Sequence, residues 1–150
     1  MESRFDGEDR HNQIVGFTCG AFDLLHSGHI IMFEEVKSWC DYLIVGLQSD
    51  PTLDRKNKNK PVQNLYERFI QLNAVKWIDE IIPYDTEESL LDILQTQEIN
   101  IRFVGEEYEF KEFTGKGLME QLGIMVHFNK RQHRFSSSNL RDRTQRGKIF

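Results

Sequence analysis

The fold of this chain is decided by the stretch Gly20-Ala21-Phe22-Asp23-Leu24-Leu25-His26-Ser27-Gly28-His29. An apolar, β-rich run over residues 14–19 leads into it, and a helical pattern over residues 30–36 follows it. Strand, turn and helix is the order that a phosphate-binding loop requires. The first backbone N–H groups of the helix have no partner within it, and they carry the positive end of the helix dipole. His26 lies three residues before His29, which predicts two imidazoles side by side in an anion-binding site.

Two glycines strengthen this interpretation. Gly20 and Gly28 have no Cβ, so the phosphates of a nucleotide can approach the backbone closely. The alternative is an ordinary strand-to-helix turn that carries two surface histidines. The spacing and the strand-to-helix context together favour the phosphate site.

The stretch resembles the signature of the cytidylyltransferase family of nucleotidyltransferases, Gly-x-Phe-Asp-x-x-His-x-Gly-His. All fixed positions of that signature are met, by Gly20, Phe22, Asp23, His26, Gly28 and His29. A match at every fixed position is a far more specific signal than an isolated Gly-x-Gly-x-x-Gly. Within the family, the length and motif arrangement are most similar to those of the glycerol-3-phosphate cytidylyltransferases.

The apolar patterns along the chain predict alternating strands and helices. Further strands are predicted at residues 41–48, 77–83 (ended by Pro83), 99–105 and 124–128, and further helices at 65–75, 86–95 and 110–122. Strands that are apolar on both faces are typical of a parallel sheet covered by helices, which places the chain in the α/β class. The resemblance implies a Rossmann-like nucleotidyltransferase fold over residues 14–140, with a parallel five-stranded sheet and helices on both faces.

Length and composition restrict the function classes. The 150 residues fit one domain, predicted at 13–150 after a flexible polar leader at 1–12. A net charge of −5 argues against a general nucleic-acid binder. We find neither an apolar run long enough to span a membrane nor a signal peptide. Cys19 and Cys40 form no disulfide framework and no zinc pattern, so we expect a cytoplasmic protein with reduced thiols.

A basic loop with Lys56 and Lys58 follows the strand predicted at 41–48. Taken alone, this run of charged residues predicts a surface loop that is exposed to solvent. In a parallel sheet, however, this loop lies at the carboxyl ends of the strands, where ligands bind. The resemblance implies that Lys56 is catalytic and that Lys58 binds the phosphorylated substrate. Arg68 matches a family Glu-Arg element, and either a structural ion pair or a phosphate contact suits it.

Two later segments match family positions. Glu107 takes the place of an aspartate in a turn at the nucleotide pocket. Arg131 takes the place of a family arginine, and Ser136 and Ser137 begin a run of hydroxyls that would cap a final helix and contact phosphate. Arg134 stands where the family has glycine, so it either adds a phosphate contact or alters the base pocket.

The resemblance implies that a nucleoside monophosphate is transferred from CTP to a small phosphorylated alcohol such as glycerol 3-phosphate, with release of pyrophosphate. This chemistry needs positioning and charge neutralisation more than a covalent nucleophile. Mg²⁺ would arrive on the triphosphate, and no metal site of the protein itself is predicted. The implied catalytic residues are His26, His29, Lys56 and Arg131. The implied nucleotide contacts are Gly20, Ala21, Phe22, Asp23, Gly28, Glu107, Ser136 and Ser137, and the implied substrate contacts are Lys58 and Arg68.

Three alternatives remain at this point. The first is an adenylyltransferase of the same superfamily that uses ATP. The second is a catalytically inactive nucleotide-binding regulator, which the intact His26 and His29 disfavour. The third is a fragment of a class I aminoacyl-tRNA synthetase, whose His-x-Gly-His is similar but which the length and net charge disfavour. The resemblance also implies a homodimer.

Overall fold

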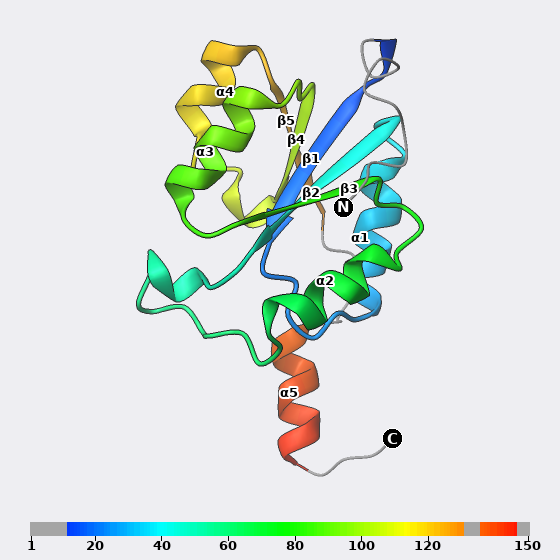
Figure 1. Ribbon diagram of the computed structural model, residues 1–150, viewed down its shortest axis with the longest axis vertical. Coiled ribbons are helices and arrows are strands. Elements are labelled where there is room, and N and C mark those ends of the chain that lie inside the picture. The colour runs from blue at the N-terminus through cyan, green and yellow to red at the C-terminus, as the bar shows by residue number, and fades with distance from the viewer. Residues whose placement is uncertain (1–11, 131–135, 147–150) are drawn as a thin grey trace.

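The computed structural model describes residues 12–130 and 136–146, in which strands and helices alternate as the sequence predicts (Figure 1). The strands are β1 (Val15–Gly20), β2 (Tyr42–Gln48), β3 (Glu80–Tyr84), β4 (Ile101–Gly105) and β5 (Met125–Asn129). The helices are α1 (Ser27–Lys37), α2 (Leu65–Asn73), α3 (Glu87–Thr96), α4 (Lys116–Leu122) and α5 (Ser137–Gln145). Two 3₁₀ turns, η2 (Pro51–Leu53) and η3 (Glu106–Tyr108), lie after β2 and β4.

The five strands form one parallel sheet in the order β3-β2-β1-β4-β5, which confirms the predicted fold class. The chain enters at the central strand, moves outward to β3, and then crosses to β4 and β5 on the other side. The direction of strand addition therefore reverses between β1 and β4. Along β1, all six residues pair with β2, but only Gly16 and Phe17 pair with β4 among the described residues. The carboxyl ends of β1 and β4 thus diverge, and such a switch point is where open α/β sheets bind ligands.

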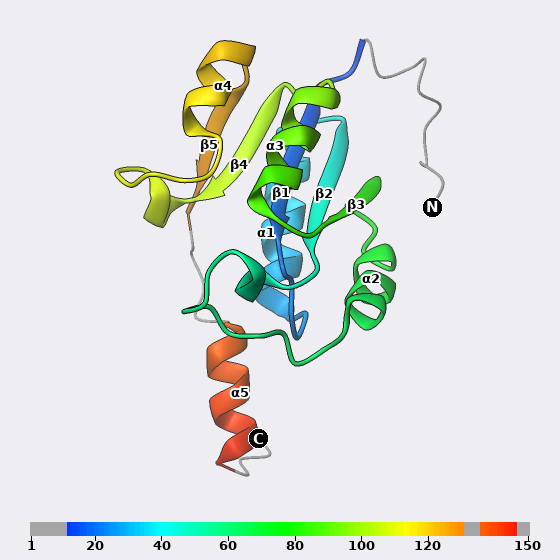
Figure 2. The same cartoon turned by 60° about the vertical axis from the view of Figure 1, so that its left-hand side comes forward.

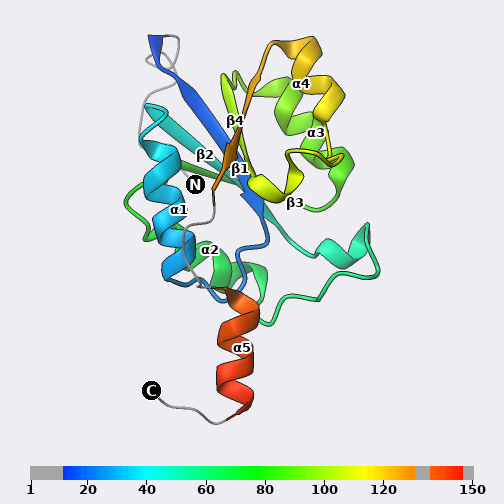
Figure 3. The ribbon, with the colours of Figure 1, turned by 180° about the vertical axis from the view of Figure 1, so that it is seen from behind.

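Helices cover both faces of the sheet, as predicted (Figures 1 and 3). On one face, α1 and α2 bury Phe33, Val36 and Leu72 against the strands. On the other face, α3 and α4 bury apolar side chains such as Leu94 and Met119. Each face therefore has its own apolar core, with β1 buried between them.

Several boundaries differ from the prediction, and two of them, at Pro83 and Gly115, have a clear physical reason. Pro83 does not end β3 but lies within it, opposite Leu47. This position is tolerated because β3 is an edge strand, so the missing N–H of proline leaves no neighbouring strand unpaired. The helix predicted at 110–122 begins only at Lys116, because Gly115 has a φ of +87°, a left-handed conformation that a helix interior does not allow.

The final helix stands apart from the others. In Figure 2, α5 lies beyond the carboxyl ends of the strands rather than against a face of the sheet. Its N-cap, Ser136, accepts a hydrogen bond from the N–H of Asn139 at 2.9 Å. The predicted leader at 1–12 lies outside the described residues except for Asn12. Among the described helices, none has the length and apolar character to cross a membrane.

Candidate functional site

A cleft of about 640 Å³ opens at the carboxyl ends of β1 and β4, at the switch point of the sheet. The start of α1 lines one side of the cleft. The turn between β3 and α3 and the segment after β4 line the other, and the loop around η2 adds residues to its rim. This volume is typical of small-molecule sites, and the position is the one expected of an open parallel sheet.

The two signature histidines lie stacked at the start of α1. His26 is the N-cap residue, and His29 is the third residue of the helix. Nδ1 of His26 accepts a hydrogen bond from the N–H of Gly28 at 3.0 Å, and Nδ1 of His29 accepts one from the N–H of His26 at 3.1 Å. The two ring centroids are 3.9 Å apart. The imidazoles thus form a capping box, a reciprocal arrangement usually made by a hydroxyl and a carboxylate.

This capping box fixes the tautomer of both rings. A neutral imidazole has one donor nitrogen and one acceptor nitrogen. Because Nδ1 accepts a backbone hydrogen in each ring, the proton of each lies on Nε2. Both histidines line the cleft beside the first N–H groups of α1. The arrangement places two imidazole donors at the positive end of the α1 dipole, which suits the oxygens of a phosphate chain.

The turn before α1 is held in a strained conformation. Phe22 and Leu24 have φ angles of +49° and +52°, in the left-handed region that non-glycine residues rarely adopt. The ring of Phe22 is buried and packs edge-on against His29, with centroids 5.7 Å apart. The N–H of Leu24 donates to Oε1 of Gln63 at 2.9 Å. These contacts hold the histidines in place from outside α1.

Asp23 joins the turn before α1 to two distant segments, the loop at Val62 and Gln63 and the helix α5 at Arg141. Its buried carboxylate accepts hydrogen bonds from the N–H groups of Val62 at 2.8 Å and Gln63 at 3.0 Å, and it pairs with Arg141 of α5 at 2.6 Å. Burial alone would raise the pKa of Asp23, but these donors outweigh burial and hold it below its usual value. The structure therefore gives Asp23 a positioning role at the base of the turn, while the predicted nucleotide contact stays a prediction.

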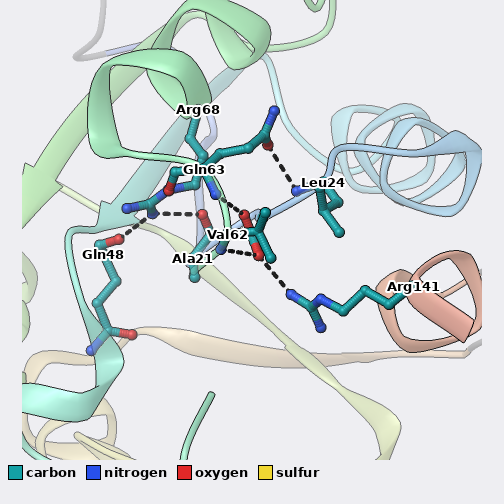
Figure 4. A network of polar contacts seen from close by, with 8 residues as sticks. Ala21, Leu24, Gln48, Val62, Gln63, Arg68 and Arg141 are labelled. Carbon is teal, nitrogen blue, oxygen red and sulfur yellow. Dashed lines mark hydrogen bonds and ion pairs between the residues drawn. The ribbon is translucent and has the colours of Figure 1, made fainter. Parts of the chain in front are cut away.

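Arg68 is also engaged within the protein (Figure 4). It is 1% exposed, and its guanidinium donates to four backbone carbonyls. These carbonyls belong to Ala21, Gln48, Ser49 and Gln63, at 2.6–3.1 Å. Burial lowers the pKa of Arg68, and the nearby carboxylates oppose that effect. This geometry favours the structural alternative, although the partners are carbonyls at the ends of β1 and β2 and before α2, and not an acidic neighbour.

The basic loop is tied to α3. Arg55 pairs with Glu87 at 2.5 Å, and the carboxylate of Asp54 accepts from the N–H of Glu87 at 2.7 Å. All three basic residues at 55, 56 and 58 are exposed, but within the described structure Arg55 and Lys58 line the cleft and Lys56 does not. The position of Lys58 in the lining therefore favours Lys58 over Lys56 as the phosphate contact of this loop.

The remaining predicted residues are distributed around the rim. Glu107 is exposed and lines the cleft after β4, and Ser136 lines it from the start of α5. Ser137 is the first residue of α5. Arg131 and Arg134 lie outside the described residues. Gly20, Ala21, Phe22 and Gly28 also belong to the lining. In the part of the chain that the structure describes, no group of three His, Cys, Asp or Glu side chains could hold a metal ion.

The side of the cleft opposite the histidines contains residues that the sequence reasoning missed. Arg102 of β4, Tyr84 of β3 and Cys19 of β1 lie there. A charged residue inside a mostly apolar strand was the available signal for Arg102. Burial, reinforced by Cys19, raises the pKa of Tyr84 far above its usual value, so its hydroxyl stays protonated. Asn129 also lines the cleft, with a buried Oδ1 that has no hydrogen-bond partner among the described residues.

Comparison with known proteins shows the family of the chain. The family model described as cytidylyltransferase-like matches residues 17–143. The bifunctional protein HldE of Paramagnetospirillum magneticum is 34% identical over 118 residues, which are 78% of this chain and 24% of that protein. The chain thus spans about a quarter of the length of the curated relatives it matches.

Two solved structures extend the comparison. A lipopolysaccharide core biosynthesis protein from Thermoplasma volcanium has a TM-score of 0.66 and 25% identity, over 83% of this chain and 100% of that one. A pantoate-β-alanine ligase from Francisella tularensis, complexed with β,γ-ATP and β-alanine, has a TM-score of 0.58 and 18% identity, over 92% of this chain and 67% of that one; it shows the fold alone. From the match over residues 17–143 and from the signature at the cleft, we conclude that the chain belongs to the cytidylyltransferase-like family of the nucleotidyltransferase superfamily.

Proposed function

We propose that this chain transfers a nucleotidyl group from a nucleoside triphosphate to a small phosphorylated substrate and releases pyrophosphate. The observation that carries the proposal is the stacked pair His26 and His29, whose Nε2–H donors lie beside the start of α1 in a cleft at the switch point. Donors fixed by a capping box need no rearrangement when charge develops.

The geometry supports an in-line displacement. An oxygen of the acceptor phosphate attacks the α-phosphorus, and the bond from that phosphorus to the bridging oxygen of the β-phosphate breaks. Negative charge builds on the non-bridging oxygens and on the departing pyrophosphate. His26, His29 and the positive end of the α1 dipole stabilise that charge, and the start of α5 at Ser136 adds a second helix terminus to the rim. Lys58 and Arg55 add positive charge from the basic loop.

Mg²⁺ enters this scheme with the substrate. The ion usually binds triphosphate oxygens and keeps several waters, and few protein ligands are needed. The ion supplies charge neutralisation on the triphosphate, while the protein's own donors address the α-phosphate.

The nucleotide and the acceptor are the finer part of the proposal. The signature's resemblance implies CTP, with ATP as its alternative, and neither the HldE relative nor the Thermoplasma protein is named a cytidylyltransferase. Both nucleotides therefore belong in the test. The acceptor is a small phosphorylated alcohol such as glycerol 3-phosphate. Because the Thermoplasma protein is named for lipopolysaccharide core biosynthesis, sugar phosphates belong in the same panel.

The experiment is a pyrophosphate-release assay. Each of the four ribonucleoside triphosphates is combined with glycerol 3-phosphate and with a panel of sugar phosphates, in the presence of Mg²⁺. We expect release with one triphosphate that depends on both the acceptor and His29. No release from any combination, in a protein that binds a triphosphate in calorimetry, would instead support the inactive regulator.

A further inference from the structure

Arg102 is a buried cation with neutral partners. It is 4% exposed, and its Nη1 donates to the carbonyl of Thr114. Its Nη2 lies 4.0 Å from Sγ of Cys19, and the guanidinium carbon lies 5.1 Å from the ring centroid of Phe113. Its Nε is buried without a hydrogen-bond partner in the described structure. No carboxylate of the described residues is within ion-pair distance of it.

Such a residue is costly for the fold. A guanidinium keeps its charge at all ordinary pH values, and burial of a charge is unfavourable unless a counter-charge or a full set of hydrogen bonds compensates. Arg68, equally buried, has four carbonyls around it. Arg102 has only one carbonyl, one distant thiol and one phenyl ring around it, so fewer of its N–H groups have an acceptor than those of Arg68. The residue therefore fits a role that requires an unneutralised cation.

The position of Arg102 indicates what that role is. Arg102 pairs with Phe17 across the switch point, and its side chain extends along the same face to Cys19, two residues nearer the carboxyl end of β1. It thus lies in the floor of the cleft on the side covered by α3, whereas His26 and His29 lie at the start of α1, which covers the other face. The cleft thus has hydrogen-bond donors on both sides of the sheet's central strand.

We propose that Arg102 binds the phosphate of the acceptor substrate and determines the enzyme's preference for phosphorylated acceptors. This inference rests on the proposed function. A planar guanidinium with unused N–H groups matches two phosphate oxygens at once. An acceptor without a phosphate would leave the guanidinium unpaired in a closed complex, and sites of this kind reject such analogues strongly.

The test compares Arg102→Leu and Arg102→Lys with the parent protein. Binding of glycerol 3-phosphate and of inorganic phosphate is measured by calorimetry without nucleotide, beside the KM values for nucleotide and acceptor and a thermal melt. Arg102→Leu should weaken binding of both probes by about 10- to 100-fold, because a hydrogen-bonded charge pair is lost. The KM for nucleotide should stay within about twofold. Arg102→Lys should recover part of the loss, since lysine keeps the charge but not the planar fork.

A matched control separates binding from a general effect of charge. Arg146→Leu makes the same change at the exposed arginine that caps the end of α5 and should alter neither probe's affinity. If Arg146→Leu lowers phosphate affinity as much as Arg102→Leu does, loss of a positive charge anywhere on the protein explains the effect and the inference is wrong.

The remaining outcomes are also decisive. Parent-like binding of both probes to Arg102→Leu overturns the inference, and so does a parent protein that binds neither probe at millimolar concentration. If Arg102→Leu does not fold, the comparison with Arg102→Lys carries the same test. A parent that binds phosphate through Arg102 but releases no pyrophosphate with any triphosphate overturns the proposed function and leaves Arg102 as a phosphate-binding residue.

Discussion

The substitution Asp23→Asn should destabilise the protein, because it removes the negative charge that holds the signature turn to residues 62–63 and to α5. The change is isosteric, so it creates no cavity. In the parent, the two carboxylate oxygens accept from Val62 and Gln63, and the oxygen bonded to Val62 also pairs with Arg141. An asparagine has one acceptor oxygen, so its NH₂ group must face one of the two backbone donors.

The magnitude follows from these contacts. One hydrogen bond to a charged acceptor, worth about 1.5–3 kcal/mol, is lost and leaves a backbone N–H without a partner. The contacts that survive are weaker because the acceptor is neutral, and the partly exposed Arg141 adds less than a buried partner would. We expect a loss of about 2–4 kcal/mol, which corresponds to about 5–15 °C in Tm for a chain of this size.

Urea unfolding at pH 7 measures this loss as a change in midpoint at constant slope. Asp142→Asn is the matched control, because Asp142 pairs with Arg146 on the exposed surface of α5 and should cost less than about 0.5 kcal/mol. A loss in Asp23→Asn no greater than in that control would refute the assigned role of Asp23.

The pH dependence of the free energy of unfolding gives an independent check on the role of Asp23. The pKa of Asp23 is lower in the folded than in the unfolded protein, for which 3.8 is the reference value. The stability that the carboxylate contributes is therefore fully present above about pH 4 and is lost as the pH falls through the lower, folded-state pKa. The difference in unfolding free energy between parent and Asp23→Asn should shrink below pH 4, and a difference that stays constant to pH 2 would contradict the assignment.

Three further predictions follow from the site. His26→Ala and His29→Ala should each lower kcat by about 100- to 1,000-fold with little change in the KM for nucleotide, since fixed donors act mainly on developing charge; steady-state kinetics that stay within a few-fold of the parent would remove their catalytic role. Lys58→Ala should raise the KM for a phosphorylated substrate, because Lys58 lines the cleft, whereas Lys56→Ala should not, because Lys56 does not line it; equal KM values in both variants would contradict the geometry of the loop. The homodimer implied by the family should give the mass of two chains in light scattering at micromolar concentration, and the mass of one chain would contradict it.

The sequence sufficed for the fold because its signals are local. The apolar strands, the Asn64 and Thr86 caps and the glycines of the signature each act within a few residues of chain. The sequence does not predict a side-chain contact whose partner lies far away along the chain. The carbonyls around Arg68 come from residues up to 47 positions away, and the Cys19 thiol beside Arg102 comes from a residue 83 positions away.

The histidine pair shows both sides of this difference. Its spacing alone predicted that His26 and His29 would meet, because both positions belong to one turn of chain. The proton on Nε2 could not be predicted, since it depends on the cap hydrogen bonds of the folded turn. Tyr84 and Asn129 carried no local signal at all, and only the sheet order brings them to the cleft.

The short contact between β1 and β4 also divides the sheet mechanically. One block contains β3, β2 and β1, the other contains β4 and β5, and within each block the strands pair at five or six positions. Two paired positions at the base join the blocks, and the cleft lies above them. Local opening begins where few hydrogen bonds must break. Amide hydrogens of β1 and β4 beside this short contact should therefore exchange with solvent sooner than those of β2. A substrate that contacts both blocks of strands should slow this exchange.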